Sequence, residues 1–163
     1  MKSDKRTLYL VRHAKALKAG AAISDIDRPL HDTGILEAYE MAGALQIQLE
    51  IPQLIISSTA ARSISTALIF QRVLNLHPDN VLVTDRLYEI DVHDLFEMVA
   101  ELDDRYHSIM LVGHNPAITL FAAKMEASML HVPTGGVVRF DFEVEKWRHS
   151  SYINAEMKLF IYP

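Results

Sequence analysis

The stretch Leu8-Tyr9-Leu10-Val11-Arg12-His13-Ala14-Lys15 decides the fold that this sequence predicts. Residues 7–11 are all apolar or β-branched, which is typical of a strand buried on both faces of a sheet. Arg12 and His13 follow where such a strand leaves the sheet. Ligands of open α/β sheets bind at the carboxyl ends of the strands. The pair therefore predicts a site where the guanidinium holds an anion and the imidazole attacks or protonates it.

The composition is that of an ordinary folded domain. The chain has 163 residues, of which 50% are hydrophobic and 23% are charged, and we expect one domain over residues 1–163. The absence of cysteine excludes disulfides, thiolate metal sites and phosphatases with a cysteine nucleophile. A net charge of −5 argues against a nucleic-acid partner, which would require a basic surface.

The sequence also predicts no membrane association. No apolar run approaches the roughly 20 residues that a bilayer-spanning helix needs. The charged residues 1–6 are not followed by the apolar core and cleavage site of a signal peptide. We therefore expect a cytoplasmic location.

Strands and helices alternate along the chain. We expect further strands at 53–57, 81–83, 108–112, 137–144 and 152–161, and helices at about 32–51, 60–74, 92–102 and 116–124. The last two strands are expected to pair antiparallel through a connection in which Trp147 serves packing. The alternation predicts an α/β fold, a three-layer sandwich whose mostly parallel central sheet has helices on both faces.

Two helix starts carry specific signals. Asp32 or Thr33 is expected to cap the first helix, which ends at Pro52. Its apolar positions recur at helical spacing, and we expect them to pack on the sheet: Ile35, Tyr39, Ala42, Leu45 and Leu49. Before the last helix, Asn115 fits the capping position and Pro116 the first helical position.

Three predicted strand ends bring cationic side chains to one edge of the sheet. The first gives Arg12 and His13, the second leads through Ser57-Ser58-Thr59 to Arg62, and the fourth ends at His114. Two arginines and two histidines around one point suit a phosphoryl group, because guanidiniums bind its oxygens in fork geometry and helix amino termini add N–H donors. Taken singly, Arg62 would suit a solvated helix position and His114 a helix-cap neighbour. The prediction rests on all four lying at strand ends.

These motifs resemble the histidine phosphatase superfamily. They are Leu10-Val11-Arg12-His13-Ala14-Lys15, Ser57-Ser58-Thr59-Ala60-Ala61-Arg62 and Val112-Gly113-His114-Asn115-Pro116. The short chain, Arg28-Pro29-Leu30 and Gly34 are similar to the small SixA-type phosphohistidine phosphatase branch, and the resemblance extends to Pro133-Thr134-Gly135-Gly136. Ala14 stands where the wider superfamily usually has glycine, and alanine occurs there in this branch.

The resemblance implies a phosphoglycerate mutase-like fold and a histidine nucleophile. His13 would attack phosphorus through one ring nitrogen, while the other carries a proton held by a backbone carbonyl. Arg12, Arg62 and His114 would stabilise the oxygens of the transferred group. We expect no metal and no other cofactor, because the two guanidiniums supply the charge and the eight histidines show no metal-binding spacing.

The remaining candidates have weaker signals. Glu89 lies where larger family members place their general acid, with Asp91 as second choice, but it equally suits a solvated loop carboxylate. A phosphorylated imidazole leaves readily, so a phosphohistidine phosphatase can act without that acid. The candidates for substrate binding are Lys15, Arg28, Ser57 and Asn115. Lys15 would widen the positive field, and Arg28 would contact substrate or pair with Asp25 or Asp27.

Three functions stay open from the sequence. The first is dephosphorylation of phosphohistidine on a protein, such as a phosphotransfer domain, because little is inserted between the motifs to cover the site. The second is hydrolysis of a small phosphate ester in a pocket formed by the segments 16–30 and 128–136. The third is a phosphate-binding domain without catalysis, which the four intact residues argue against. A phosphoglycerate mutase would need a closed site.

Overall fold

A six-stranded sheet organises the chain, whose computed structural model describes residues 4–129 and 131–163. Four strands are parallel: β1 (Arg6–Arg12), β2 (Leu54–Ser58), β3 (Val81–Thr84) and β4 (Ser108–Gly113). Two run antiparallel to their neighbours: β5 (Val137–Phe142) and β6 (Ala155–Ile161). The strand order is β3-β2-β4-β1-β5-β6. The predicted mostly parallel sheet and its antiparallel final pair are confirmed.

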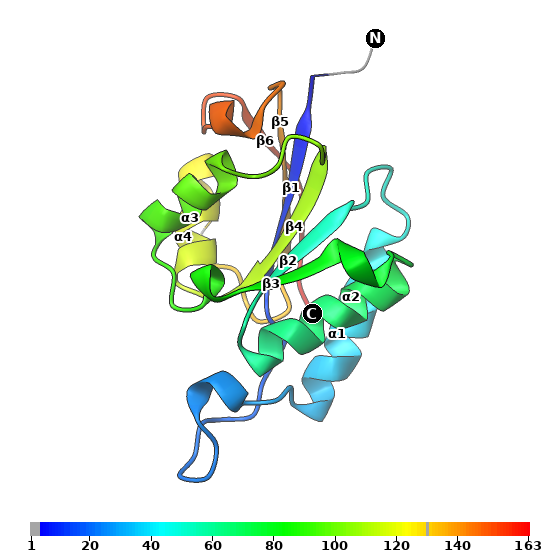
Figure 1. The fold of residues 1–163 in the computed structure, drawn as a ribbon, viewed down its shortest axis with the longest axis vertical. Helices are drawn as coiled ribbons and strands as arrows, with labels where there is room; N and C mark the ends of the chain where they lie inside the picture. The colour runs from blue at the N-terminus through cyan, green and yellow to red at the C-terminus, as the bar shows by residue number, and fades with distance from the viewer. Residues whose placement is uncertain (1–3, 130) are drawn as a thin grey trace.

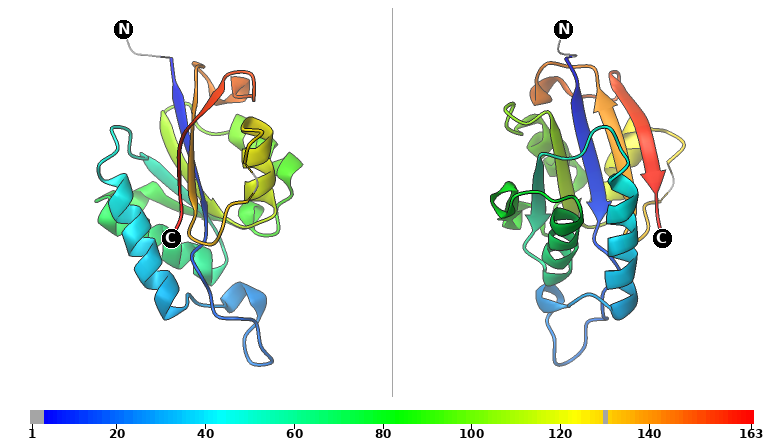
Figure 2. Two further views of the ribbon diagram at one scale, coloured as in Figure 1. Left: turned by 180° about the vertical axis from the view of Figure 1, so that it is seen from behind. Right: turned by 90° about the vertical axis from the view of Figure 1, so that its right-hand side faces the viewer.

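Helices cover both faces of the sheet, so the three-layer α/β sandwich is confirmed (Figures 1 and 2). α1 (Asp32–Leu45) and α2 (Ala61–Val73) lie on one face, and α3 (Val92–Ala100) and α4 (Ala117–Met125) on the other. Alternate residues of β1 enter the two cores: Tyr9 and Val11 pack on the side of α1 and α2, and Leu8 and Leu10 on the side of α3 and α4.

β1 lies inside the sheet, between β4 and β5. Its residues from Arg6 to Val11 are buried, as the sequence predicts, because helices cover both sides. The carboxyl end of β1 therefore delivers Arg12 and His13 to the middle of one sheet edge. A long loop that contains the 3₁₀ turn Asp25–Asp27 lies at that same end of the molecule (Figure 1, blue).

The predicted start of α1 is confirmed, whereas its predicted cap, its predicted end and three of its five predicted inward positions are wrong. The helix begins at Asp32, is capped by a ring nitrogen of His31 that accepts the N–H of Thr33, and ends at Leu45, well before Pro52. Its buried residues are Gly34, Ala38, Met41, Ala42 and Leu45. Of the expected inward positions, Ile35, Tyr39 and Leu49 are exposed by 38%, 36% and 101%, whereas Ala42 and Leu45 are buried.

The physical reason is a close approach of α1 to the segment after β1. A Cβ at Gly34 would lie 2.1 Å from the carbonyl oxygen of Lys15. Only small residues fit where the helix lies so close to this backbone. Gly34, Ala38 and Ala42 therefore face inward in place of the larger side chains that the periodicity predicted. Periodicity of large apolar residues alone could not reveal this.

The other boundaries differ by small amounts. α4 begins at Ala117, one residue later than predicted, with Pro116 at the capping position. Asn115 still serves the helix start, because its side-chain oxygen accepts the N–H of Thr119. Trp147 is fully buried and donates its ring N–H to the carbonyl of Tyr106, which confirms its packing role.

Within residues 4–129 and 131–163, no helix is both long and apolar enough to cross a bilayer. The expected cytoplasmic location stays a prediction. Residues 1–3, and Leu130 in the segment 128–136, lie outside the described residues.

Candidate active site

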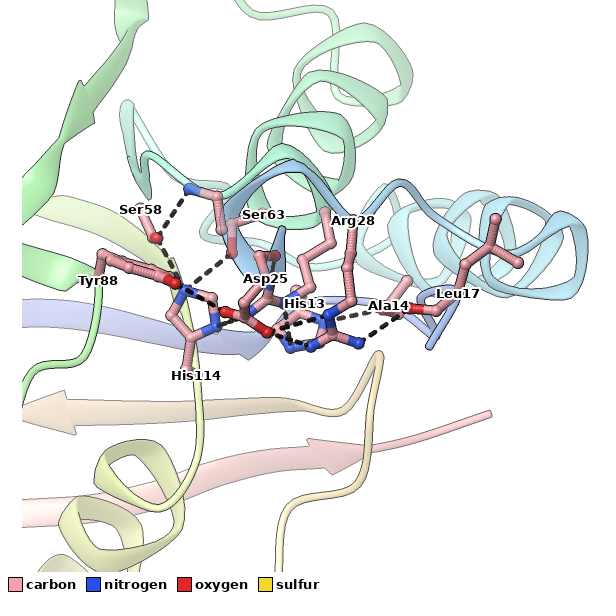
Figure 3. Close-up of polar contacts among 11 residues, drawn as sticks. His13, Ala14, Leu17, Asp25, Arg28, Ser58, Ser63, Tyr88 and His114 are labelled. Carbon is pink, nitrogen blue, oxygen red and sulfur yellow. Dashed lines mark hydrogen bonds and ion pairs between the residues drawn. The ribbon is translucent and has the colours of Figure 1, made fainter. Parts of the chain in front are cut away.

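The carboxyl ends of β1 and β4 and the first turn of α2 bring the four predicted site residues together. Figure 3 shows His13 and His114 of this set with their polar contacts. Arg12, His13, Arg62 and His114 line one open pocket of about 230 Å³. The pocket wall is completed by Asp25, Tyr88, Glu89 and Asn115. Convergence of the three motifs at one edge of the sheet is thus as the sequence predicts.

His13 is held in one tautomer. Its Nδ1 lies 2.8 Å from the carbonyl oxygen of Ala14, which can only accept a hydrogen bond, so Nδ1 carries the proton. Nε2 therefore keeps its lone pair. Burial lowers the pKa of His13 to about 3, so the ring is neutral at physiological pH. The N–H of Ala14 donates to Thr66 (3.0 Å), which fixes the backbone next to His13.

Arg62 connects the two histidines. Its Nε donates to Nε2 of His13 (3.2 Å), and its Nη2 lies 3.4 Å from Nδ1 of His114. The two imidazole centroids are 5.1 Å apart. Arg62 is 5% exposed because it occupies the second position of α2, directly above the end of β2. One edge of the guanidinium therefore faces the space between both rings.

His114 is oriented by a serine that sequence reasoning overlooked. Its Nε2 lies 2.7 Å from Oγ of Ser58, which also accepts the N–H of Ala60. Because Arg62 can only donate, its contact with Nδ1 selects the tautomer in which Nε2–H donates to Ser58. Burial, with a smaller effect of the Arg62 charge, lowers the pKa of His114 to about 4. The ring is therefore neutral at physiological pH.

The predicted role of Ser57 in substrate binding does not fit its position. Ser57 is fully buried, is not among the residues that line the pocket, and donates its hydroxyl to the carbonyl of Ser58. Alternation along β2 turns neighbouring side chains to opposite faces, so Ser58 reaches the site and Ser57 does not. The serine of this motif that contacts a residue of the pocket is Ser58, through its hydrogen bond with His114.

Arg12 presents a nitrogen without a partner. Its Nη1 donates to the carbonyl of Val132 (3.2 Å), whereas Nε is buried and has no hydrogen-bond partner within the described part of the chain. Burial also lowers the pKa of this guanidinium. A buried donor of this kind is costly to leave unpaired, and it belongs to a side chain that lines the pocket.

Asp25 and Tyr88 are further members of the pocket that the sequence analysis missed. The Asp25 carboxylate accepts the Tyr88 hydroxyl (2.7 Å) and Nη2 of Arg62 (3.1 Å). The hydrogen bond from Tyr88, together with Arg62 and Arg28, lowers the pKa of Asp25 to about 2. No spacing in the sequence indicates that this loop residue meets α2.

Of the weaker candidates, Glu89 and Asn115 line the pocket and Lys15 and Arg28 are not among the lining residues. Arg28 pairs with Asp25 (3.0 Å), as one of its two expected roles required. Lys15 is exposed. Asp91, the second choice as acid, caps α3 by accepting the N–H of Asp94. In the part of the chain that the structure describes, no cluster of three or more histidine or acidic side chains could hold a metal ion.

Comparison with known proteins gives consistent results. The chain is 29% identical to the putative phosphohistidine phosphatase SixA of Agrobacterium tumefaciens, with a TM-score of 0.83 over 97% of this chain and 98% of that one. A mycobacterial glucosyl-3-phosphoglycerate phosphatase shares the fold at 16% identity and a TM-score of 0.66, over 95% of this chain and 98% of that one.

A relative from Arabidopsis thaliana, described as an uncharacterized chloroplastic protein, is 30% identical over 140 residues. The match covers 81% of this chain and 64% of the length of that relative. The family described as the histidine phosphatase superfamily (branch 1) matches residues 8–115, a segment that contains every residue lining the pocket. The chain belongs to this superfamily.

Proposed function

We propose that this protein, as a single histidine phosphatase domain, removes the phosphoryl group from phosphohistidine on another protein without a metal. Superfamily membership supports a phosphatase. The observation that carries the mechanism is the tautomer of His13, in which Nδ1 is tied to Ala14 and Nε2 faces the pocket beside Arg62. The likeness to the putative phosphohistidine phosphatase SixA of A. tumefaciens supports phosphohistidine as the group attacked.

The proposed reaction has two displacements at phosphorus. The lone pair on Nε2 of His13 attacks, the bond from phosphorus to the substrate imidazole breaks, and that imidazole keeps the bonding electrons. When the second nitrogen of the substrate ring carries a proton, the imidazole leaves as a neutral molecule and needs no general acid. Water then attacks the phosphorylated His13, which releases inorganic phosphate and restores the neutral ring, and the water proton passes to solvent.

Arg12, Arg62 and His114 would stabilise the charge on the oxygens of the transferred group. Loss of one such preorganised donor costs about 3–4 kcal/mol in the transition state. Burial keeps His114 neutral at physiological pH, but a phosphoryl dianion beside it would raise the pKa of the ring. We therefore expect His114 to become protonated on binding and to donate from Nδ1 while Nε2–H stays on Ser58.

An open pocket favours a side chain on a folded partner. Residues 85–91 alone connect β3 to α3, so this connection adds no lid over His13. A phosphorylated side chain that projects from a partner can enter such a site without the partner unfolding.

A small phosphate ester is the second candidate substrate. The observation in its favour is Glu89, which lines the pocket at the position expected for a general acid. An ester leaves as an alkoxide that must be protonated, and a general acid contributes about 10²- to 10⁴-fold to such a step.

The test compares a phosphotransfer domain phosphorylated on histidine with an alkyl phosphate, both without metal. His13→Ala removes the nucleophile, and His93→Ala is the matched control, because His93 lies on an exposed face of α3. The proposal expects rapid loss of phosphate from the domain alone, retained in His93→Ala and absent in His13→Ala. Faster release from the ester would assign a small-molecule phosphatase. No release and no phosphorylated His13 from either would leave a binding domain.

A further inference from the structure

The guanidinium of Arg62 is contacted along two different edges. One edge, Nε with Nη2, faces Nε2 of His13 and Nδ1 of His114. The other edge, Nη1 with Nη2, is held by a single residue: Nη1 donates to the backbone carbonyl of Asp25 (2.7 Å), and Nη2 donates to its carboxylate (3.1 Å). The two edges of a guanidinium are fixed relative to each other, so a contact on one determines the direction of the other.

Asp25 is itself held from two further directions (Figure 3). The Tyr88 hydroxyl donates to Oδ2 (2.7 Å), and Arg28 donates from Nε to Oδ1 (3.0 Å). Arg28 in turn donates to the carbonyl of Leu17, which lies at the other side of the same loop. The carboxylate is therefore fixed by the loop and by the segment after β3, although its side chain is 48% exposed.

Asp25 is unsuited to donate a proton or to bind substrate phosphate. Its hydrogen bond from Tyr88 and its two arginine neighbours keep the carboxylate ionised at neutral pH, because they lower its pKa to about 2. A negative charge beside a phosphoryl group would repel it. The presence of Asp25 in the pocket is therefore not explained by direct participation in the reaction.

We propose, building on the proposed function, that Asp25 is a positioning residue. It binds the edge of Arg62 formed by Nη1 and Nη2, and so directs Nε and Nη2 at the phosphoryl group. Once phosphate displaces the contacts of Arg62 with the histidines, the contacts with Asp25 are the remaining side-chain hydrogen bonds described for its guanidinium. The loop that carries Asp25 thereby takes part in the reaction without touching the substrate.

The opposite role, a carboxylate that competes with phosphate for Arg62, predicts the opposite sign. If Asp25 only blocked the site, its neutral variants would bind anions more tightly and react faster. If it positions Arg62, those variants react more slowly although the pocket has become more positive. The direction of the change therefore separates the two roles.

The experiment measures kcat and KM on a histidine-phosphorylated phosphotransfer domain for Asp25→Ala and Asp25→Asn. We expect Asp25→Ala to lower kcat about 10- to 100-fold with little change in KM, since a misplacement of ~1 Å can cost about 10²-fold. Asp25→Asn should recover part of the loss, because its amide oxygen still accepts from Nη2. Asp27→Ala is the control: Asp27 lies on the same 3₁₀ turn, is exposed, and accepts only from Ser24 among the contacts described.

A double-mutant cycle excludes a merely structural effect. In the Arg62→Ala background, Asp25→Ala should have almost no further effect on kcat, because its target is gone. Equal losses in both backgrounds, or an Asp25→Ala enzyme as fast as the wild type, would overturn the proposal. The affinity for vanadate, which mimics five-coordinate phosphorus, is measured for the same four proteins of the cycle. It reports on the placement of Arg62 even if no substrate is turned over. Coupling in vanadate binding without turnover would therefore reject the proposed function and retain the role of Asp25.

Discussion

Oγ of Ser58 lies 2.7 Å from Nε2 of His114, so the end of β2 fixes the ring that β4 delivers. The same hydroxyl accepts the N–H of Ala60, which ties it to the turn into α2. This contact orients the His114 ring so that Nδ1 lies beside Arg62 in the pocket.

Ser58→Ala is therefore expected to lower kcat by about tenfold or more, a loss typical of removing a partner that orients a functional histidine. Steady-state kinetics on the phosphorylated protein substrate measure it. The matched control is Ser57→Ala, which removes a hydroxyl from the adjacent residue of the same strand without exposing the pocket. Equal losses of kcat in both variants would argue that Ser58 acts only through the stability of β2.

Acid should destabilise the fold through the buried histidines. The pKa of His13 falls to about 3 in the folded chain from an ordinary 6.5, so below about pH 6 the unfolded chain binds a proton that the folded chain does not. The folded chain keeps this stability in full above about pH 6.5. Below that pH, proton binding by the unfolded chain lowers the free energy of unfolding by about 1.4 kcal/mol per pH unit for His13. Urea denaturation at pH 7 and pH 5 measures this, and His13→Gln should flatten the dependence. An unchanged slope in that variant would assign the acid sensitivity to other groups.

Gly34→Ala should strongly destabilise the protein, because the new Cβ would lie 2.1 Å from the carbonyl oxygen of Lys15. Overpacking of this kind costs about 1–3 kcal/mol, and the obstacle here is backbone, which cannot rotate away. Gly43→Ala in the same helix is the control. No atom lies within 4 Å of its new Cβ, and alanine in a helix is favoured by about 0.5–1 kcal/mol over glycine. Thermal unfolding of both variants should show shifts of opposite sign.

Glu89→Gln separates the two candidate substrates. On a phosphorylated histidine the change should be small, because the imidazole leaves without help. On an alkyl phosphate a catalytic acid at this position would be worth about 10²-fold or more. The ratio of kcat/KM for the two substrates is the measurement. A large loss on the phosphorylated protein would mean that the leaving imidazole is protonated by Glu89 after all.

The sequence predicted the strand ends well because their signals are local. A buried run followed by Arg12 and His13, and a second ending at His114, need no knowledge of distant contacts. The three-layer sandwich follows from the alternation of strands and helices. Predictions from such local patterns hold in the folded chain, because each apolar run must be buried against another part of the protein.

What the sequence could not reveal depends on contacts between segments far apart in the chain. Asp25 and Tyr88 meet at Arg62 only because the loop after β1 folds over the sheet edge. The inward face of α1 is set by the backbone near Lys15, so small residues replaced the expected Ile35 and Tyr39. Ser57 and Ser58 are chemically identical, and only the alternation of side chains along β2 decides that Ser58 is the one that contacts His114.

The interior position of β1 has a consequence for synthesis of the protein. Its partners are β4 and β5, more than a hundred residues later in the chain, so β1 and the His13 that follows it are synthesised long before the strand has neighbours. Until Phe142 has been made, β1 keeps an unpaired edge, which is a hazard for aggregation. Arg12, His13, Arg62 and His114 can therefore meet in one pocket only after β4 has been translated and has paired with β1.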